Sequence, residues 1–262
     1  MTTSMPLNRD GAALLRALTH RIHNDLVSSI KIVSSDAVRA ENPEVKAALG
    51  NVVELLEHYS DIHRVLAVPH GGGLVDAAEC IRNLGLAVSR SLEPFGMRLT
   101  LVADTLPLES QRCWRLALAV HELVTNAARH ARFDGREGAI KIQLALEDTV
   151  VHCIVADNGS LSTRLKPAQG LQMVSDLVKS LGGRIDYGFG TQFSSFLLMF
   201  PLTMQEQRAN RIVASRRARG AMQRKAVAPQ SRPPAARAQS TRVRNVPQTV
   251  SAAAAPLRRN GM

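Results

Sequence analysis

Three polar side chains recur at intervals of four residues in an otherwise apolar segment, HELVTNAARHA at residues 121–131. They are Glu122, Asn126 and His130, and on an α-helix positions i, i+4 and i+8 fall within about 80° of arc. The neighbouring Leu, Val and Ala side chains take the other faces of such a helix. This pattern predicts a helix that is buried on most sides and leaves one polar wall open to a ligand.

Two further stretches carry groups suited to binding a nucleotide. Asp157, Asn158 and Gly159 follow the predicted strand VVHCIVA. A carboxylate fixed at a strand end accepts a hydrogen bond from an exocyclic amine such as that of adenine, and glycine lets the ligand approach the backbone. Gly170 and Leu171 open a predicted helix, whose free N–H groups attract phosphate. Taken singly, these stretches are also typical of an ordinary turn and a plain helix start.

The elements that would position these residues begin with a helical hairpin. Apolar residues at helical spacing predict one helix over about residues 8–40 and a second over 44–66, separated by Asn42-Pro43, which disfavours helix. Each helix has a single apolar seam, so the pair is too thin to shield a core of its own. We therefore expect a homodimer in which two hairpins form a four-helix bundle. The stretch HGGG at residues 70–73 predicts a flexible joint after the hairpin.

A different alternation follows this joint. We predict helices over residues 74–92, 111–132 and 170–181 and strands over 97–103, 139–146, 150–156, 184–189 and 192–200. Helices mixed with antiparallel hairpins predict an α+β fold, in which a two-layer α/β sandwich follows the helical hairpin. The two folded domains are accordingly expected at residues 1–69 and 74–202.

The net charge of +11 is concentrated at the carboxyl-terminal end. Of the 33 Lys and Arg residues, 13 follow residue 202 with one acidic residue, whereas the preceding chain holds 20 basic and 21 acidic residues. Large apolar residues are scarce after Val213, so residues 203–262 are predicted to be a disordered tail. Its first part, about 203–226, could form a basic helix on an acidic partner, nucleic acid or a membrane surface, and the alternative is a solubilising extension without a partner.

Cysteine spacing and hydropathy indicate the cellular compartment of the protein. Cys80, Cys113 and Cys153 are single and widely spaced, which fits neither a disulfide framework nor a zinc site. There is no run of 18 apolar residues and no signal-peptide pattern. We therefore expect a cytoplasmic protein with reduced core cysteines and no transmembrane segment.

The order of the motifs resembles the Bergerat-type ATP-binding domain shared by histidine kinases, gyrase and MutL. The resemblance covers about residues 74–201, with ELVTN on a helix, DNG after a strand, then GLQMV and a closing LGG-strand-GT-strand. It implies ATP and Mg²⁺ as ligands. Asn126 would coordinate Mg²⁺, Glu122 would act as a base or orient the attacking group, and His130 would lie along the same nucleotide-binding wall.

The same resemblance assigns the two ends of the nucleotide. Asp157 would bind the adenine amino group with Gly159 permitting its approach, and Gly170 with Leu171 would form the phosphate-side loop. Two features depart from the family pattern. The motif Asp-x-Gly-x-Gly has Leu161 in place of its second glycine, and the lid between DNG and GLQMV is only about ten residues long.

The first helix resembles the phosphoacceptor box of the HisKA_2-type and HWE-type histidine kinases, whose pattern is His-Arg-x-Lys-Asn-x-Leu. In LLRALTHRIHNDL, His20, Arg21, Asn24 and Leu26 match, and His23 stands where Lys is usual. On a helical wheel His20 lies about 155° from the centre of the apolar stripe and His23 about 95°. His20 is thus expected to face solvent and His23 to be less exposed.

The combined resemblance implies a histidine kinase of a two-component system, which phosphorylates its own His20 from ATP and passes the phosphoryl group to an Asp of a response-regulator receiver domain. One alternative is a phosphotransferase resembling the ChpT type, which shuttles phosphoryl groups through His20 without using ATP. The intact ELVTN motif favours the kinase, because the phosphotransferases have typically lost it. A third hypothesis, a nucleic-acid or membrane binder acting through the basic tail, finds no support in a near-neutral core with 3% aromatic residues.

Overall fold

The computed structural model describes residues 9–69, 71–93, 96–133, 135–161, 169–190 and 193–227. The chain divides into two compact units, Met1–Gly220 and Ala221–Met262, and of the second unit only the helical residues 221–227 are described. The helices are α1 Arg9–Arg39, α2 Pro43–Val65, α3 Ala77–Leu92, α4 Ser110–His130, α5 Gln169–Ser180 and α6 Met204–Val227. The strands are β1 Leu74–Asp76, β2 Met97–Ala103, β3 Pro107–Glu109, β4 Ala131–Arg132, β5 Gly138–Glu147, β6 Val150–Asp157, β7 Ser160–Leu161, β8 Arg184–Phe189 and β9 Ser194–Pro201. None of the described helices is long and apolar enough to cross a membrane.

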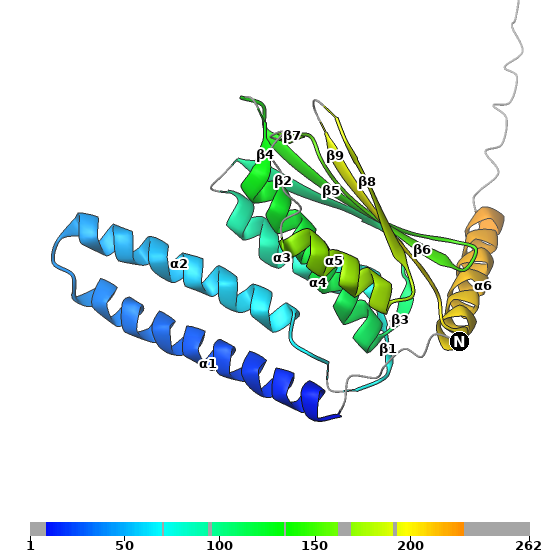
Figure 1. Ribbon diagram of the computed structural model, residues 1–262, viewed down its shortest axis with the longest axis horizontal. Helices are drawn as coiled ribbons and strands as arrows, with labels where there is room; N and C mark the ends of the chain where they lie inside the picture. Colours follow the sequence, from blue (N-terminus) through cyan, green and yellow to red (C-terminus); the bar gives the residue numbers. More distant parts are fainter. Residues whose placement is uncertain are drawn as a thin grey trace, which may run out of the picture. The chain divides into compact units, whose positions relative to one another are not determined.

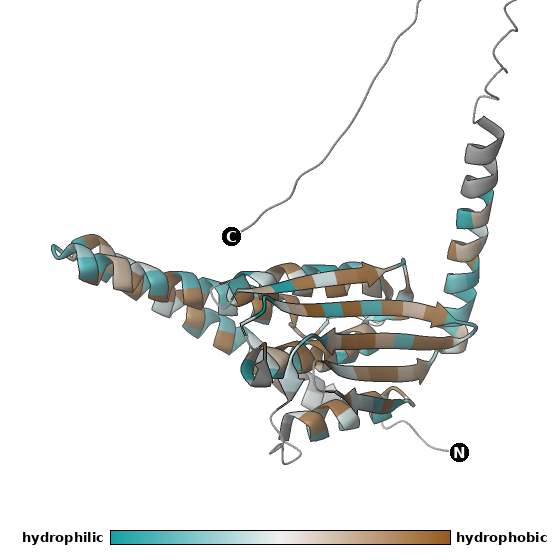
Figure 2. Cartoon of the chain, turned by 90° about the horizontal axis from the view of Figure 1, so that it is seen from above, coloured by the Kyte–Doolittle hydropathy of each residue, from teal (hydrophilic) through white to brown (hydrophobic). Residues whose placement is uncertain are grey.

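Helices α1 and α2 form the predicted antiparallel hairpin (Figure 1). Asn42 caps α2, since its Oδ1 accepts a hydrogen bond from the Glu44 N–H at 2.8 Å, and Pro43 takes the first helical position, where its missing N–H costs nothing. Hydrophobic and hydrophilic residues alternate along both helices (Figure 2). The two helices bury only part of this apolar surface, because several large apolar side chains remain more than 40% exposed: Leu14, Leu18, Ile22, Ile32, Val38, Val45, Val52, Leu55 and Tyr59.

A five-stranded mixed sheet carries the rest of the first unit. Its order is β2-β5-β6-β9-β8, with β2 and β5 parallel and the other neighbours antiparallel. Helices α3, α4 and α5 cover one face of the sheet (Figure 1). Alternate residues of β6 are buried, as expected for a sheet with one covered face. The β5–β6 turn contains Asp148 with φ 55°, a left-handed conformation that Asp tolerates in tight turns.

The segment after the joint differs from the prediction of one helix over 74–92. Residues 74–76 form strand β1, which pairs with β3, and α3 begins only at Ala77. Asp76 explains the boundary because its Oδ1 accepts hydrogen bonds from the N–H groups of Ala78, at 3.0 Å, and Leu106, at 2.8 Å. One carboxylate therefore caps α3 and ties it to the residue before β3.

Composition predicted a disordered tail after residue 202, but residues 204–227 form helix α6, and the domain boundary at residue 202 stays a prediction. Thr203 and Glu206 make a capping box: the Thr203 N–H donates to Glu206 Oε2 at 2.8 Å, and the Glu206 N–H donates to Thr203 Oγ1 at 3.3 Å. Glu206 is fully buried, and its Oε1 accepts from Arg112 Nε at 3.0 Å and from the Glu109 N–H at 2.9 Å. The helix thus begins on the sheet domain rather than on an outside partner.

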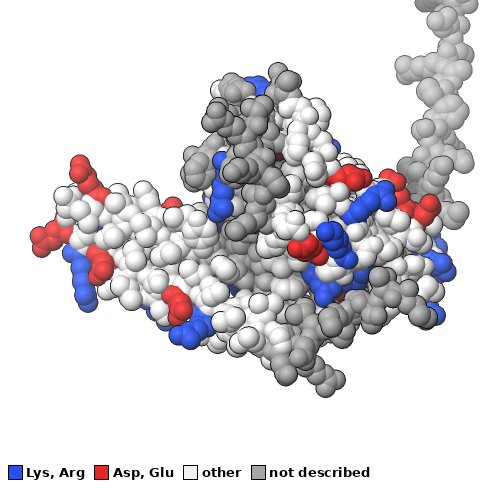
Figure 3. Space-filling model, viewed as in Figure 1, with Lys and Arg blue, Asp and Glu red and all other residues white. Residues whose placement is uncertain are grey.

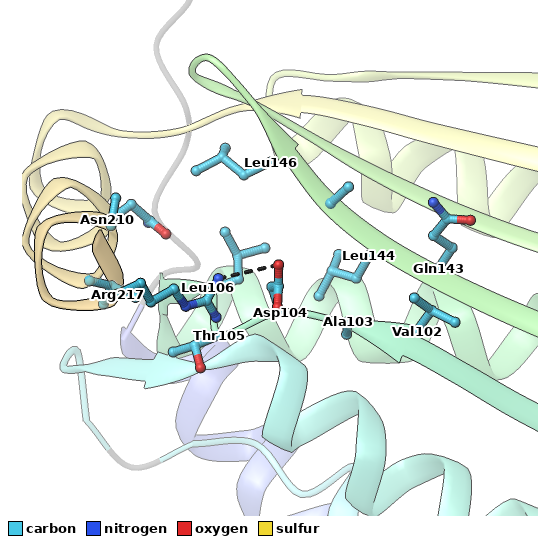
Figure 4. Close-up of a pocket in the computed structure, with 13 residues that line it drawn as sticks. Val102, Ala103, Asp104, Thr105, Leu106, Gln143, Leu144, Leu146, Asn210 and Arg217 are labelled. Atoms are coloured by element: carbon cyan, nitrogen blue, oxygen red, sulfur yellow. Dashed lines mark ion pairs between the residues drawn. The ribbon is translucent and has the colours of Figure 1, made fainter. Parts of the chain in front are cut away.

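Farther along α6, an ion pair and a cavity mark its contact with the sheet. Arg217 Nη1 lies 3.2 Å from Asp104 Oδ2, just beyond β2 (Figure 4). Asn210, on the same side of α6, is buried and donates from Nδ2 to the carbonyl of Pro107 at 2.9 Å. These contacts enclose a cavity of about 450 Å³ against the ends of β2 and β5. Its apolar lining includes Val102 and Leu146.

Removing the buried carboxylate of α6 is expected to destabilise the fold strongly. Glu206→Ala leaves the Arg112 guanidinium, whose side chain is only 13% exposed, without its charge partner. Breaking a buried pair in this way typically costs about 3–5 kcal/mol of unfolding free energy. Chemical denaturation monitored by circular dichroism measures the loss, and Gln205→Ala, at an exposed neighbouring position, is the control. Equal stability of the two variants would show that α6 is not part of the folded core.

Candidate functional site

The predicted ligand wall lies on α4. Glu122 and Asn126 are half-buried, and between them Leu123 and Val124 are buried in the core. Helix α4 packs these apolar side chains against the sheet, so its two polar side chains point to the side that α5 borders. His130 is the last residue of α4, and its side chain lies outside the described part of the structure.

Gly170, in the first turn of α5, lies directly against this wall. A Cβ added at Gly170 would collide with the carboxylate of Glu122 and would lie 3.2 Å from Asn126 Nδ2. The structure therefore brings together three residues that the sequence predicted for one site. The amino-terminal end of α5, which carries the positive end of the helix dipole, faces the Glu122 carboxylate and the Asn126 amide. Leu171 follows in the same turn and is half-buried.

A methyl group at position 170 is expected to disturb the site more than the fold. In Gly170→Ala the colliding atoms belong to the flexible end of Glu122, which can move aside at little cost in stability. We expect an unfolding midpoint near that of the wild type but a loss of about 10-fold or more in any activity that needs Glu122 in place. Glu122→Asp, combined with Gly170→Ala, shortens the carboxylate arm and should restore part of the activity. A Gly170→Ala variant with full activity would contradict this placement.

Asp157 ends β6 and is 7% exposed. Its Oδ1 accepts a hydrogen bond from the Gly159 N–H at 2.9 Å. Burial raises the pKa of this carboxyl, while the Gly159 N–H and the Ser194 hydroxyl act in the opposite direction. A carboxylate held at a strand end and kept from water is suited to accept a hydrogen bond from a ligand amine.

Ser194 is a site residue that the sequence did not indicate. It begins β9 and pairs with Asp157 across the β6–β9 ladder. It is 1% exposed, and its Oγ makes no hydrogen bond of good geometry with any described residue. Ser194 Oγ is close enough to Asp157 to lower the pKa of that carboxyl, yet the contact lacks good hydrogen-bond geometry. A buried hydroxyl without a well-formed hydrogen bond costs free energy, so this group is available to a ligand or a water molecule beside Asp157. Its place beside Asp157 follows only from the register of β6 and β9.

Asn158, between Asp157 and Gly159, has a structural role. Its Oδ1 accepts from the Ala139 N–H at 2.7 Å, and its Nδ2 donates to the Glu137 carbonyl at 3.0 Å. Asn158 therefore clamps the start of β5 to the end of β6. The sequence DNG thus combines a candidate ligand group with a structural clamp.

On the hairpin, the two histidines of α1 differ in exposure as predicted. His20 is exposed, and its Nδ1 lies 3.2 Å from the amide Nδ2 of Asn24, one turn later. His23 is half-buried, and its Nδ1 lies 3.4 Å from the hydroxyl of Ser60 on α2. His23 therefore belongs to the contact between the helices, whereas His20 belongs to the surface.

The joint between hairpin and sheet is tethered in the described residues. The Ser110 N–H donates to the Gly73 carbonyl at 2.9 Å, and its hydroxyl donates to the Gly71 carbonyl. Trp114 Nε1 donates to the carbonyl of Leu66 at 2.8 Å. The first turns of α4 thus hold the segment that the sequence predicts to be a hinge. The lid between DNG and GLQMV falls largely on residues 162–168, outside the described part, and the side chain of Leu161 is not described either.

Comparisons with known proteins agree with the fold. Residues 86–184 match the family model of the histidine kinase-like ATPase domain. Sensor histidine kinase PdtaS of Mycobacterium tuberculosis is 27% identical over 180 residues, which cover 64% of this chain and 35% of that protein. The chain thus spans about a third of the length of this curated relative.

A solved structure extends the similarity beyond the matched segment. The histidine kinase domain of the Erythrobacter litoralis EL346 blue-light activated histidine kinase superposes with a TM-score of 0.51 at 16% identity, covering 71% of this chain and 98% of that domain. The predicted histidine kinase-like ATP-binding fold is therefore confirmed at this level. The HisKA_2 or HWE subtype and the relation to ChpT stay predictions.

Proposed function

We propose that the chain is a histidine kinase of a two-component system, in which ATP bound by the sheet domain phosphorylates His20 on the helical hairpin. The observation that carries this proposal is the pairing of an exposed His20 with a histidine kinase-like ATPase domain whose Asp157 is buried at a strand end. The recipient of the phosphoryl group would be an aspartate of a receiver domain. The similarity to a sensor histidine kinase supports this assignment.

Several described residues have the chemistry to bind the parts of an adenine nucleotide. The Asp157 carboxylate accepts a hydrogen bond from the adenine amine, and the Ser194 hydroxyl beside it, which lacks a well-formed hydrogen bond, binds the same edge directly or through water. Asn126 would hold Mg²⁺, which when bound neutralises charge on the phosphates. Its place beside Gly170 and the amino-terminal end of α5 supports a phosphate site there.

On the hairpin, Asn24 would set the tautomer of His20. With the amide turned so that Oδ1 faces Nδ1, Asn24 accepts the Nδ1–H and leaves a lone pair on Nε2, because neutral imidazole carries one proton. Nε2 then attacks the γ-phosphorus, and Glu122 orients the ring or accepts its proton. Movement about residues 69–73 brings the two parts together, which requires release of the Ser110 contacts.

The exposed apolar row on the hairpin supports a homodimer. Leu14, Leu18 and Ile22 follow one another at four-residue spacing on α1, each more than 40% exposed. On the face of the hairpin that Figure 3 shows, the charged side chains are few and scattered. A row of this kind is costly in water and is typical of a protein interface. Two copies packed along it would form a four-helix bundle.

A charge placed in this row is expected to separate the dimer. In Leu18→Glu, burial of a carboxylate in the bundle core opposes association. The fold of each chain should survive, because the side chain is already 48% exposed. Sedimentation velocity should show a monomer for Leu18→Glu and a dimer for the wild type and for Ser35→Glu, at an exposed polar position of α1. An unchanged sedimentation coefficient for Leu18→Glu would rule out this interface.

One observation favours the phosphotransferase alternative. Gly170 fills the space beside Glu122 and Asn126, so the nucleotide must displace or reshape the start of α5. A protein that never binds ATP would keep this contact closed and use only His20. The same hairpin and sheet domain serve both activities.

Incubation with Mg²⁺ and γ-labelled ATP separates the two functions. The kinase proposal predicts labelling of the wild type, and Asn126→Ala should abolish labelling by ATP yet leave intact the back-transfer from a phosphorylated receiver domain. Equilibrium binding of a fluorescent ATP analogue is measured in parallel. If neither labelling nor binding occurs while back-transfer persists, the protein is a phosphotransferase and the kinase proposal fails.

A further inference from the structure

Two cysteines that lie far apart in the sequence line one cavity. Cys80 is in the first turn of α3 and Cys113 in the first turn of α4. Both face a cavity of about 340 Å³, whose wall also contains Trp114 and the linker residues Ala67 and Pro69. Cys80 is half-buried and Cys113 is 1% exposed. A reagent in the cavity therefore reaches the Cys80 sulfur before the Cys113 sulfur.

The two thiols also differ in chemistry. A hydrogen bond from Cys113 lowers the pKa of Cys80, against the opposing effects of burial and of Glu79. The same hydrogen bond, with burial, raises the pKa of Cys113 well above the ordinary thiol range. A thiolate is the reactive form of cysteine, and a nearby thiol able to resolve the first oxidation product is typical of a redox-active pair.

We propose that Cys80 and Cys113 form a reversible redox site, in which hydrogen peroxide oxidises Cys80 and Cys113 resolves the product as an intramolecular disulfide. The Cys80 thiolate attacks one peroxide oxygen and the O–O bond breaks, which gives a sulfenic acid and hydroxide that is protonated to water. The Cys113 sulfur then attacks the sulfenic sulfur, an S–S bond forms, and the S–O bond breaks. The second water leaves with the Cys113 proton, so two thiols are oxidised while one peroxide is reduced to two waters.

The position of this pair connects it to the joint between hairpin and sheet. The same cavity wall contains Ser110 and Trp114, which hold the joint through the carbonyls of Gly71, Gly73 and Leu66. An S–S bond draws the first turns of α3 and α4 together, so it changes the shape of this wall. The redox state of the pair therefore affects the contacts that attach the hairpin to the sheet domain.

Cys153 provides an internal control in the same chain. It is buried in β6 away from this cavity, and burial raises its pKa to about 12. Under native conditions we expect Cys80 to be alkylated by iodoacetamide at least about 10-fold faster than Cys153. Equal rates for Cys80 and Cys153 would overturn the proposal.

The full chain is treated with hydrogen peroxide and followed by peptide mass mapping and by the fluorescence of Trp114, the single tryptophan of the chain. The wild type should lose the free thiols of Cys80 and Cys113, gain one peptide pair linked through them, and show quenched indole emission that dithiothreitol restores. Cys113→Ala should instead accumulate a sulfenic acid on Cys80 that dimedone traps. In Cys80→Ala, the Cys113 thiol should react with peroxide no faster than the Cys153 thiol. Absence of the linked peptide from the wild type, or its formation only between chains, would disprove the site even if a variant failed to fold.

Discussion

Replacement of His20 by alanine is expected to reduce labelling from γ-labelled ATP to background, whereas the wild type acquires an acid-labile, alkali-stable phosphate. The physical reason is that the His20 imidazole is exposed, and Asn24 occupies Nδ1, so that Nε2 is the nitrogen available for attack. A kinase without its nucleophile retains nucleotide binding but has no acceptor. Binding of the ATP analogue should therefore remain at the wild-type level in His20→Ala.

His23→Ala is the matched control, because it removes the same group one turn away on the same helix. His23 is half-buried against Ser60 of α2, so its loss should lower the stability of the hairpin slightly and leave labelling largely intact. Phosphopeptide mapping assigns the labelled residue in each variant. Label that persists in His20→Ala, or disappears in His23→Ala while ATP binding is retained, would move the acceptor to His23 and refute the assignment.

Two strands were predicted to the residue. Strands β2 and β8 match their predicted bounds of 97–103 and 184–189, because residues typical of turns flank both strands. The exposure of His20 and the partial burial of His23 also followed from helical geometry. These predictions depended only on the spacing of residues along one helix or strand.

Contacts between distant segments were not predictable in the same way. Asn158 clamps Glu137 and Ala139, and Ser194 lies opposite Asp157, only because β5, β6 and β9 pair in one particular register. The sequence contains no local sign of that register. Asn158 therefore looked like part of a turn, and Ser194 like an ordinary strand residue.

Helix α6 depends both on a local sequence pattern and on a contact between distant segments. Thr203 and Glu206 form a capping box at the start of the helix, a local pattern that the prediction from composition did not use. Composition nevertheless predicted disorder, because arginines dominate the residues that follow. What composition cannot show is that Glu206 finds Arg112, ninety-four positions earlier, in a buried site. One such anchor fixes the first turns of a helix whose remaining surface is highly polar.

Asp157→Asn is expected to weaken ATP binding by about 10- to 100-fold, because a hydrogen bond to a charged group contributes roughly 1.5–3 kcal/mol. The fold should not suffer from this change. Burial raises the pKa of Asp157, so the ionised carboxylate costs stability at neutral pH, and a neutral amide of the same shape removes that cost. Isothermal titration calorimetry with ATP measures the affinity, and thermal unfolding in the absence of ligand measures the stability. Asp176→Asn, on the exposed face of α5, should change neither quantity.

The raised pKa of Asp157 sets the direction in which stability and ATP affinity change with pH. Because the folded-state pKa of Asp157 lies above its ordinary value, its contribution to the free energy of unfolding increases as the pH falls through that pKa and is complete below the unfolded-state value. The ionised carboxylate is the stronger acceptor for the adenine amine, so ATP affinity should fall over the same interval in which the ligand-free protein gains stability from this group. Asp157→Asn should lose both dependences together. An ATP affinity that is unchanged by Asp157→Asn at neutral pH would place the adenine elsewhere, and the site built around β6 and β9 would not be the nucleotide site.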